Sequence, residues 1–469
     1  MKLIYNVKDR PPFAQVIVFA IQQLLAIMAA TLVVPVITNN NEELVAKFGE
    51  GAIGMSPAAA LMGAGIGTLV YLLFTKFKSP VFLGSSFAFL GSMAAAFAGA
   101  TTVALGYVGL LIGATLAGLV YVVIAIIVKL VGVNWINKLM PPVVIGPVVS
   151  IIGLSLAGNA VGDIVKGGVQ VNNVPVASPH IALICGLVTL AVVMIASTYG
   201  KKMARLIPFI LGILAGYATA LIFTLIGNAA GIDALKVLSF DAFKNLLTDG
   251  KVTLETFLTL PDFTFLKALG GFKEITGSYV ATVAVAYVPV AFVVFAEHIA
   301  DHKNISSIIE TDLLEEPGLH RTLLGDGVGS IAGAIVGGCP NTTYGESVGC
   351  VAITGNASVV TILTAAIGAI IISFIAPFVA FVNSIPACVM GGVCMALYGF
   401  IAVSGLKMVQ KVDLEQNRNL FVVSTILISG IGGLTLTFGK VTITSIACAL
   451  ILGVLSNLLL SKADKKEQE

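Results

Sequence analysis

The sequence predicts an all-α polytopic membrane protein, and three observations lead to that fold class. Of the 469 residues, 57% are hydrophobic and only 11% are charged, whereas a soluble domain carries about 25% charged residues. The mean hydropathy of +1.02 is also far above that of a disordered chain, which needs low hydrophobicity. Apolar stretches of about 20 residues, long enough to cross a bilayer, recur along the whole chain.

About fourteen segments qualify as membrane spans. Eleven are continuous, at 14–38, 52–75, 104–130, 141–160, 180–198, 206–227, 278–299, 357–382, 384–405, 418–438 and 441–461. The segments 80–99 and 338–354 are apolar but interrupted by small polar residues, and the segment 322–337 is short and rich in Gly and Ala.

Charges in the connections predict the orientation. Alternate connections in the first half are basic and lack acidic residues, with Lys76, Lys78, Lys129, Lys138, Lys201, Lys202 and Arg205. The intervening ones hold Glu42, Glu43, Lys47, Glu50, Asp163 and Lys166. Because basic connections stay in the cytoplasm, we expect both termini, including the tail 462–469, to be cytoplasmic. The polar connection 228–277 is then extracellular or periplasmic.

The connection 228–277 divides the chain into a first repeat, 1–227, and a second repeat, 278–461. Seven spans in each half give the halves opposite orientations, which is typical of a transporter built from an inverted repeat. The two interrupted segments are each third in their half, so they are the third and tenth spans. Such paired breaks predict short strand or half-helix segments at a substrate site near the middle of the membrane.

Two carboxylates lie in the apolar part of the chain. Glu297 and His298 follow an uncharged run inside the eighth span, and Glu346 is followed by no charged residue until Lys407. Charges inside a membrane are costly and mark functional sites. The functional interpretation is a ligand-binding or proton-carrying pair, and the alternative is that both carboxylates lie at helix ends facing water.

The breaks themselves predict backbone donors. Short side chains at 341–343 are expected to cap a helix that starts near Tyr344, and Ser85 and Ser86 to do the same before Phe87. Two helix starts would offer amides to a carbonyl oxygen, while Glu297 and Glu346 would accept from N–H groups. The implied ligand is small and planar, with both carbonyl and N–H groups. Phe87, Tyr344 and Tyr398 would cover its faces, unless they only pack in the core.

The remaining polar groups have simpler interpretations. Asp301 lies one turn after Glu297, so it either shares its helix face or forms a solvated helix end. Asp326 is expected near a helix start in a structural role. We expect His180, His302 and His320 to be solvated. No metal, nucleophile or nucleotide-binding motif and no basic run occurs, so we expect no enzyme activity, no cofactor and no nucleic-acid partner.

Three stretches carry a resemblance to a known family. Residues 295–300 read Phe-Ala-Glu-His-Ile-Ala, residues 84–89 read Gly-Ser-Ser-Phe-Ala-Phe, and residues 340–346 read Pro-Asn-Thr-Thr-Tyr-Gly-Glu. Together they resemble the nucleobase/ascorbate transporter family, most of all its bacterial uracil permeases. The resemblance implies proton-coupled import of uracil across the inner or plasma membrane by a homodimer. It also implies a core domain, at about 14–130 plus 278–382, and a gate domain, at about 141–227 plus 384–461.

The resemblance assigns roles residue by residue. Glu297 and Glu346 match the substrate-site glutamates, and Phe87 and Gly345 match positions whose amides meet the base carbonyls. Ala30, Tyr344 and Tyr398 match residues around the ring. The candidates for proton coupling are Glu346, Asp301, Glu297 and His298.

The sequence departs from the family pattern at four positions. Gln23 and Asp301 stand where the uracil permeases have histidines, with His302 displaced by one position. Ser347 and Gly355 replace an asparagine and a basic residue of the family signature. A purine (xanthine or uric acid) permease and a sodium-coupled nucleobase carrier therefore remain alternative functions.

Overall fold

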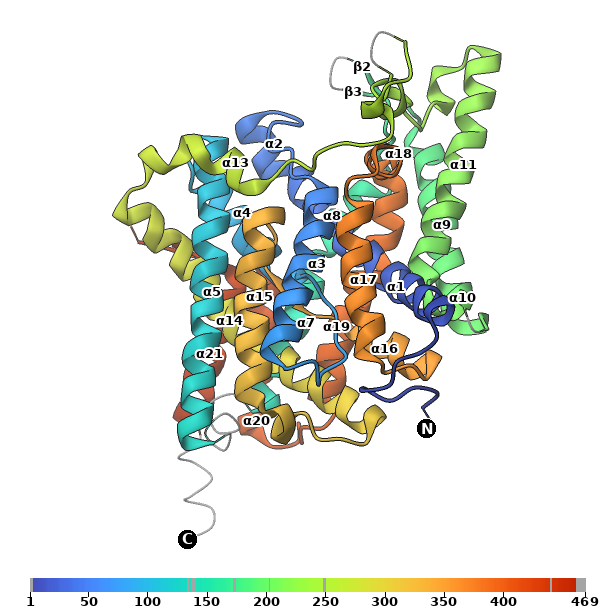
Figure 1. The fold of residues 1–469 in the computed structure, drawn as a ribbon. Coiled ribbons are helices and arrows are strands. Elements are labelled where there is room, and N and C mark those ends of the chain that lie inside the picture. Colours follow the sequence, from blue (N-terminus) through green and yellow to red (C-terminus); the bar gives the residue numbers. More distant parts are fainter. Residues whose placement is uncertain are drawn as a thin grey trace.

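The computed structural model describes residues 3–132, 135, 141–171, 174–201, 203–247, 250–438 and 441–460. The expected tail 462–469 lies outside the described residues. Within them the chain is predominantly helical, and most long helices stand side by side (Figure 1). Eight described helices are long and apolar enough to cross a membrane. The chain is thus a multi-pass membrane protein by length and composition of its helices.

The helices of the first half follow the expected spans closely. They are α1 (Phe13–Asn39), α3 (Pro57–Phe74), α4 (Leu90–Ala98), α5 (Val103–Val131), α7 (Pro142–Ser155), α8 (Ala157–Asp163), α9 (Pro179–Tyr199), α10 (Met203–Leu206) and α11 (Pro208–Ala230). The strand β1 (Leu83–Ser85) and the 3-10 turn η1 (Phe87–Phe89) precede α4, and the short helix α2 (Glu42–Phe48) lies between α1 and α3. Side-chain caps from Asn41, Ser56 and Thr102 begin α2, α3 and α5.

The second half also consists of long and short helices with a few short strands. It comprises α14 (Gly277–Ile309), α15 (Leu319–Gly337), β4 (Asn341–Thr343), α16 (Gly345–Thr354), α17 (Val359–Ile372), α18 (Ala376–Ser384), α19 (Ala387–Val409), α20 (Asn417–Ile431), β5 (Leu436–Phe438), β6 (Val441–Ile443) and α21 (Ser445–Leu460). The connections hold β2 (Gln170–Val171), β3 (Val174–Pro175), α12 (Asp241–Lys244) and α13 (Thr264–Ala268). Short 3-10 or π turns occur at Asp233–Leu235, Leu254–Thr256, Leu269–Glu274 and Leu314–Gly318.

Four expected spans need correction. The segment 357–382 is two helices, because the chain turns at 373–375 and α18 restarts with a proline at its first turn. The segments 418–438 and 441–461 yield the shorter helices α20 and α21, joined by the antiparallel pair β5–β6. The segment 278–299 extends to Ile309, so Glu297, His298 and Asp301 lie inside α14 and not at its end.

Two short strands from opposite halves meet at the centre of the fold. β1 and β4 pair antiparallel, with Leu83 opposite Thr343 and Ser85 opposite Asn341. The amide of Ser86 extends the ladder by donating to the carbonyl of Pro340 at 2.9 Å. Glycines allow α3 and α15 to pack closely beside this pair, because a Cβ on Gly63 would come within 2.4 Å of the Gly333 carbonyl oxygen.

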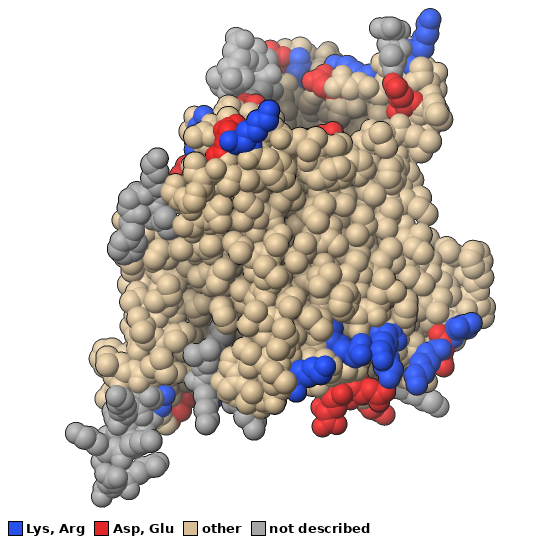
Figure 2. All heavy atoms as spheres, turned by 60° about the vertical axis from the view of Figure 1, so that its left-hand side comes forward, with Lys and Arg blue, Asp and Glu red and all other residues tan. Residues whose placement is uncertain are grey.

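Charged side chains gather at two opposite rims of the molecule. Figure 2 shows a broad band without Lys, Arg, Asp or Glu between them on the face in view. The helices α2 and α13 lie at the upper rim of Figure 1, and the first turn of α20 lies at the lower one. The distribution fits a bilayer around the band, because lipid-facing charge is costly.

Candidate functional site

A cavity of about 410 Å³ lies where the two strands and their half-helices face α19. Its described lining residues on the strand side are Ser86, Phe87, Ala88, Thr342, Thr343, Tyr344, Gly345 and Glu346. The helix α14 contributes Glu297, Ala300, Asp301 and Asn304. The opposite wall is Val149, Ile152, Phe209, Leu397, Phe400, Ile401, Ser404 and Met408. The cavity thus has one polar wall and one largely apolar wall.

The start of α16 presents free backbone donors to the cavity. The helix begins at Gly345 with Tyr344 as its N-cap residue, and no side chain caps it. The first amides of a helix have no partner within it, and they carry a partial positive charge. Because Gly345 lines the cavity, its amide is available to an oxygen of a ligand, whereas the Glu346 carboxylate lies against its own amide.

The expectation that residues 341–343 cap this helix is wrong. They form β4, and their side chains serve other partners: the Asn341 amide donates to the Gly63 carbonyl at 2.9 Å, and the Thr343 hydroxyl donates to Asp301 Oδ2 at 2.8 Å. Ser85 likewise belongs to β1, and the Ser86 side chain makes no cap bond to η1. The amides at both helix starts are therefore left uncapped by side chains.

Three carboxylates line the cavity. Glu297 and Asp301 lie one turn apart on α14, and Glu346 lies in the first turn of α16. No lysine or arginine is among the described residues that line the cavity. Carboxylates in such a place need hydrogen-bond donors or a proton. A ligand with N–H groups would supply the donors.

Asp301 belongs to the functional face of α14. It is buried, with 8% of its surface exposed, and it accepts the hydrogen bond from Thr343. Of the two interpretations of this residue, the shared helix face fits the structure, and the solvated helix end does not.

The aromatic residues take different places. Phe87 and Tyr344 line the cavity, and the Tyr344 hydroxyl donates to the Ser85 carbonyl at 2.6 Å. Tyr398 is buried behind the wall and meets Phe87 edge-on, with ring centroids 6.3 Å apart. Ala30 is buried in α1 and is not among the lining residues. Tyr398 and Ala30 therefore support the site from behind.

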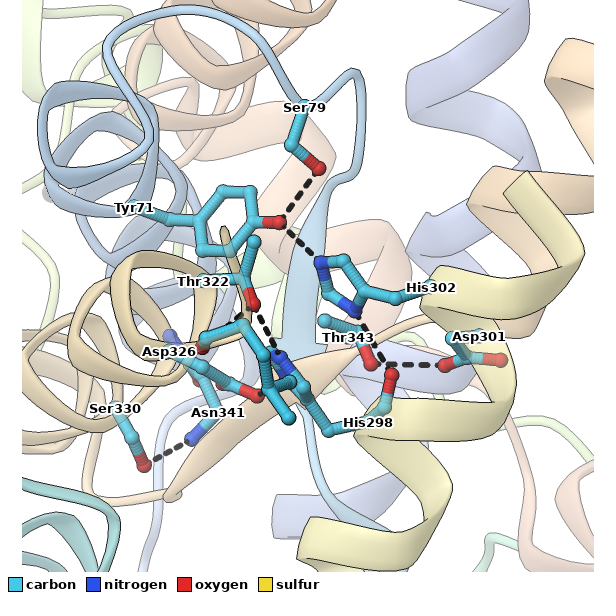
Figure 3. A network of polar contacts seen from close by, with 11 residues as sticks. Tyr71, Ser79, His298, Asp301, His302, Thr322, Asp326, Ser330, Asn341 and Thr343 are labelled. Atoms are coloured by element: carbon cyan, nitrogen blue, oxygen red, sulfur yellow. Dashed lines mark hydrogen bonds and ion pairs between the residues drawn. The ribbon is translucent and has the colours of Figure 1, made fainter. Parts of the chain in front are cut away.

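His298 points away from the cavity, toward α15 (Figure 3). Its Nδ1 lies 2.6 Å from Asp326 Oδ2 and its Nε2 lies 3.0 Å from Thr322 Oγ1. Asp326 is fully buried two turns inside α15, so the expectation that it lies near a helix start is wrong. His302 is also fully buried and bonds Tyr71, so the expectation that it is solvated is wrong.

Sequence reasoning also missed contacts made by residues far apart in the chain. Gln23 on α1 donates a hydrogen bond to the Ser347 hydroxyl on α16, and the amide of Phe82 donates to the same oxygen at 3.0 Å. The apolar wall from α7, α11 and α19 carries no motif. Of all these residues, only Gln23 stands out in the sequence, because it is polar within a long apolar run.

Comparisons with known proteins identify the family of this chain. The family model of the xanthine/uracil permeases, described as a permease family, matches residues 14–438. A uracil permease of Bacillus caldolyticus is 38% identical over 98% of this chain and 95% of its own. A uracil permease of Bacillus subtilis (strain 168) is 37% identical over 100% of this chain and 97% of its own.

Solved structures share the fold. The murine Slc26a9 anion transporter in its inward-facing state matches with a TM-score of 0.63 at 12% identity, over 97% of this chain and 69% of that one. The transmembrane domain of the cyanobacterial bicarbonate transporter BicA matches with a TM-score of 0.58 at 14% identity, over 96% and 100%. With a family model that spans nearly the whole chain and full-length relatives, the chain belongs to the xanthine/uracil permease family, the nucleobase/ascorbate transporters, and is a membrane permease and not an enzyme.

Proposed function

We propose that the chain imports uracil by proton symport. The observation that carries this proposal is the pairing of donors and acceptors in the cavity: the uncapped amides at Phe87 and Gly345, and the carboxylates of Glu297 and Glu346. Uracil is planar and carries two carbonyl groups and two ring N–H groups, so it complements both sets. The uracil permeases among its relatives support the same substrate.

In this mechanism Glu297 accepts from the ring N–H groups, and the helix starts receive the carbonyl oxygens. Phe87 and Tyr344 cover part of the ring. A proton on a cavity carboxylate would offset the cost of its buried charge, and Glu346 and Asp301 are the groups we assign to that proton. Binding of proton and uracil is then linked through the same cavity.

For the whole chain we propose fourteen spans in a seven-plus-seven inverted repeat. The packing of the helices supports this repeat, because several helix pairs in one half have an equivalent pair in the other half. α1 packs against α17 as α14 packs against α5, and α9 packs against α11 as α20 packs against α21. Equivalent elements also meet directly, in the pairs α3–α15, β1–β4 and α7–α19.

We further propose a core domain, at about 14–130 plus 278–382, that moves against a gate domain, at about 141–227 plus 384–461. The cavity supports this division, because its polar wall comes from the start of η1, β4, α14 and α16 and its apolar wall from α7, α11 and α19. We place the protein in the inner or plasma membrane as a homodimer, with both termini cytoplasmic. Crosslinking in native membranes tests the dimer.

Uptake of radiolabelled uracil into proteoliposomes tests the function. We expect saturable uptake that an inward-directed proton gradient accelerates, and that unlabelled uracil abolishes more effectively than xanthine, thymine or cytosine. Uptake that follows a sodium gradient and ignores the proton gradient would reject proton coupling. Preferential competition by xanthine would reject uracil as the substrate.

A further inference from the structure

A buried polar network joins α14, α15 and α3 beside the cavity (Figure 3). On one side, Asp326 Oδ2, His298 and Thr322 form a chain of contacts of 2.6 and 3.0 Å. On the other side, His302 lies 2.6 Å from the Tyr71 hydroxyl, which lies 2.7 Å from Ser79 Oγ. All six side chains are fully buried, and none of them lines the cavity.

The hydrogen bonds of His302 place one of its protons. Its Nδ1 lies 2.8 Å from the carbonyl oxygen of His298, and a carbonyl can only accept, so Nδ1 carries a proton. A second proton on Nε2 would put an uncompensated positive charge on a fully buried ring, so we assign Nε2 as the acceptor from the Tyr71 hydroxyl, which then accepts from Ser79. His302 is neutral in this arrangement, and the stacked His298 ring, with centroids 4.0 Å apart, disfavours two positive charges.

When the donors and acceptors around His298 are assigned in the same way, the His298–Asp326 pair needs an additional proton. The Thr322 hydroxyl donates its single hydrogen to the Leu319 carbonyl at 3.0 Å. With the hydrogen in this direction, the Thr322 oxygen accepts from His298, so Nε2 carries a proton. The contact between Nδ1 and Asp326 needs a second proton, either on the imidazole or on the carboxyl group. In both cases the pair is electrically neutral and holds one proton more than an ionised aspartate beside a neutral histidine.

The alternative without this proton is unfavourable. Thr322 would turn its hydrogen to His298 Nε2, and Asp326 would stay ionised beside a neutral histidine. Asp326 Oδ1 has no hydrogen-bond partner among the described residues, and Glu297 and Asp301 are close enough to add repulsion. A buried, partly unpaired carboxylate without a cation is strongly unfavourable.

We infer that His298 and Asp326 hold one permanent buried proton that takes no part in transport, and that with Thr322 they position α14 so that Glu297 faces the cavity. The proton count rests on the hydrogen bonds and on the burial of Asp326. The statement that this proton is not transported rests on the proposed proton symport. It removes His298 from the candidates for proton coupling and leaves the carboxylates that line the cavity: Glu297, Asp301 and Glu346.

The titratable groups around the pair come from four elements. Glu297, Asp301 and His302 lie on α14 itself, Tyr71 lies on α3, and Glu346 lies on α16. Tyr121 on α5 faces His298 with ring centroids 6.2 Å apart. None of the groups named is basic apart from His302, which is neutral. These neighbours therefore favour a His298–Asp326 pair without net charge.

Nitrogen NMR of histidine-labelled protein in lipid nanodiscs tests the proton count directly. The chain has four histidines, and the Gln variants of His180, His302 and His320 assign the signals. We expect His298 Nε2 to stay protonated across about pH 5 to 8, the window in which an ordinary histidine titrates. A His298 with unprotonated Nε2, or one that titrates in this window, would overturn the inference.

Transport by Asp326→Asn tests whether the proton is exchanged. The asparagine amide keeps a neutral donor toward His298 Nδ1, so we expect the pH profile of uptake and the protons per uracil to match the wild type. Asp301→Asn, on the cavity side of the same region, is the matched control and should change the profile. A changed profile in Asp326→Asn would show that its proton is transported. If the wild type ignores the proton gradient, the proposed symport fails, and the NMR result alone decides the inference.

Discussion

The Gln23 side-chain amide donates a hydrogen bond to the hydroxyl of Ser347, which joins α1 to the half-helix α16 directly beside Glu346. Ser347 also accepts from the amide of Phe82, just before β1. The two residues are fully or almost fully buried. Both stand where the sequence departs from the uracil permease pattern, and the contact shows that the two departures form one unit.

Because of this contact, the effects of substitutions at Gln23 and Ser347 on stability should depend on each other. Gln23→Ala and Ser347→Ala each leave buried polar partners unpaired, so each should lower the free energy of unfolding by about 1–3 kcal/mol. The double variant should cost clearly less than the sum, because residues in one hydrogen-bond network are not additive. Thermal unfolding in nanodiscs measures all three. Gln22→Ala is the control, since Gln22 Oε1 has no hydrogen-bond partner among the described residues, and fully additive losses would contradict the prediction.

Glu297→Gln should weaken uracil binding while the protein stays folded. The carboxylate accepts from base N–H groups, whereas an amide can present its own NH₂ to them. A donor left unpaired in the site costs about 1–3 kcal/mol, and 1.4 kcal/mol corresponds to about a tenfold loss of affinity. Equilibrium binding of labelled uracil measures the loss, and size-exclusion chromatography checks folding. Affinity near that of the wild type would mean that Glu297 does not contact the base.

Glu346→Gln and Asp301→Asn should separate binding from proton coupling. If these groups carry the coupling proton, their neutral variants lose the response to a proton gradient more than they lose equilibrium affinity. Glu297→Gln should reduce both together. Gradient-driven uptake and binding are compared for each variant at matched expression. Normal proton-driven accumulation in both variants would place the coupling proton elsewhere.

Gly84→Ala should disrupt the site through a single methyl group. A Cβ at Gly84 would lie 2.4 Å from the ring of Tyr344, whose hydroxyl is fixed by the Ser85 carbonyl. The ring must shift, so uracil affinity should fall by about tenfold or more, in line with an overpacking cost of about 1–3 kcal/mol. Gly349→Ala is the matched control on α16, because nothing lies within 4 Å of its Cβ. Equal affinities for the two variants would exclude this role of Gly84.

The topology predicts which segments react with reagents added outside. Single cysteines in the connection 228–277, introduced into a chain without the six native cysteines, should be labelled by an impermeant maleimide on intact cells. Cysteines in the tail 462–469 should react only after permeabilisation. The reverse pattern would invert the proposed orientation.

The sequence was sufficient for the features that depend on local composition. Apolar length identified the eight described helices that are long enough to cross a membrane, and small polar residues within apolar runs marked the two segments that contain β1 and β4. The uncharged run before Glu297 and the one after Glu346 indicated the site, and both carboxylates line the cavity. These signals need no knowledge of neighbours in space.

The predictions that were wrong concern residues whose environment is determined by segments far away in the sequence. His302 lies between Asp301 and Lys303, so its sequence neighbourhood indicates water, yet Tyr71 from α3 covers it and bonds its ring. Asp326 likewise owes its burial to His298 from α14. Residues 341–343 have the composition of a helix cap, but pairing with β1 draws them into a strand. Tertiary partners of this kind cannot be deduced from a single sequence.

The pairing of β1 with β4 also has a consequence for biosynthesis. A strand inside a membrane protein leaves backbone donors and acceptors unpaired until its partner arrives, and β4 follows β1 by more than half of the chain. The first half therefore enters the bilayer before the Phe82 carbonyl and the Ser86 amide have their partners, which are the Tyr344 amide and the Pro340 carbonyl. The binding site matures only after translation has passed α16, so the ribosome completes most of the chain before any substrate pocket exists.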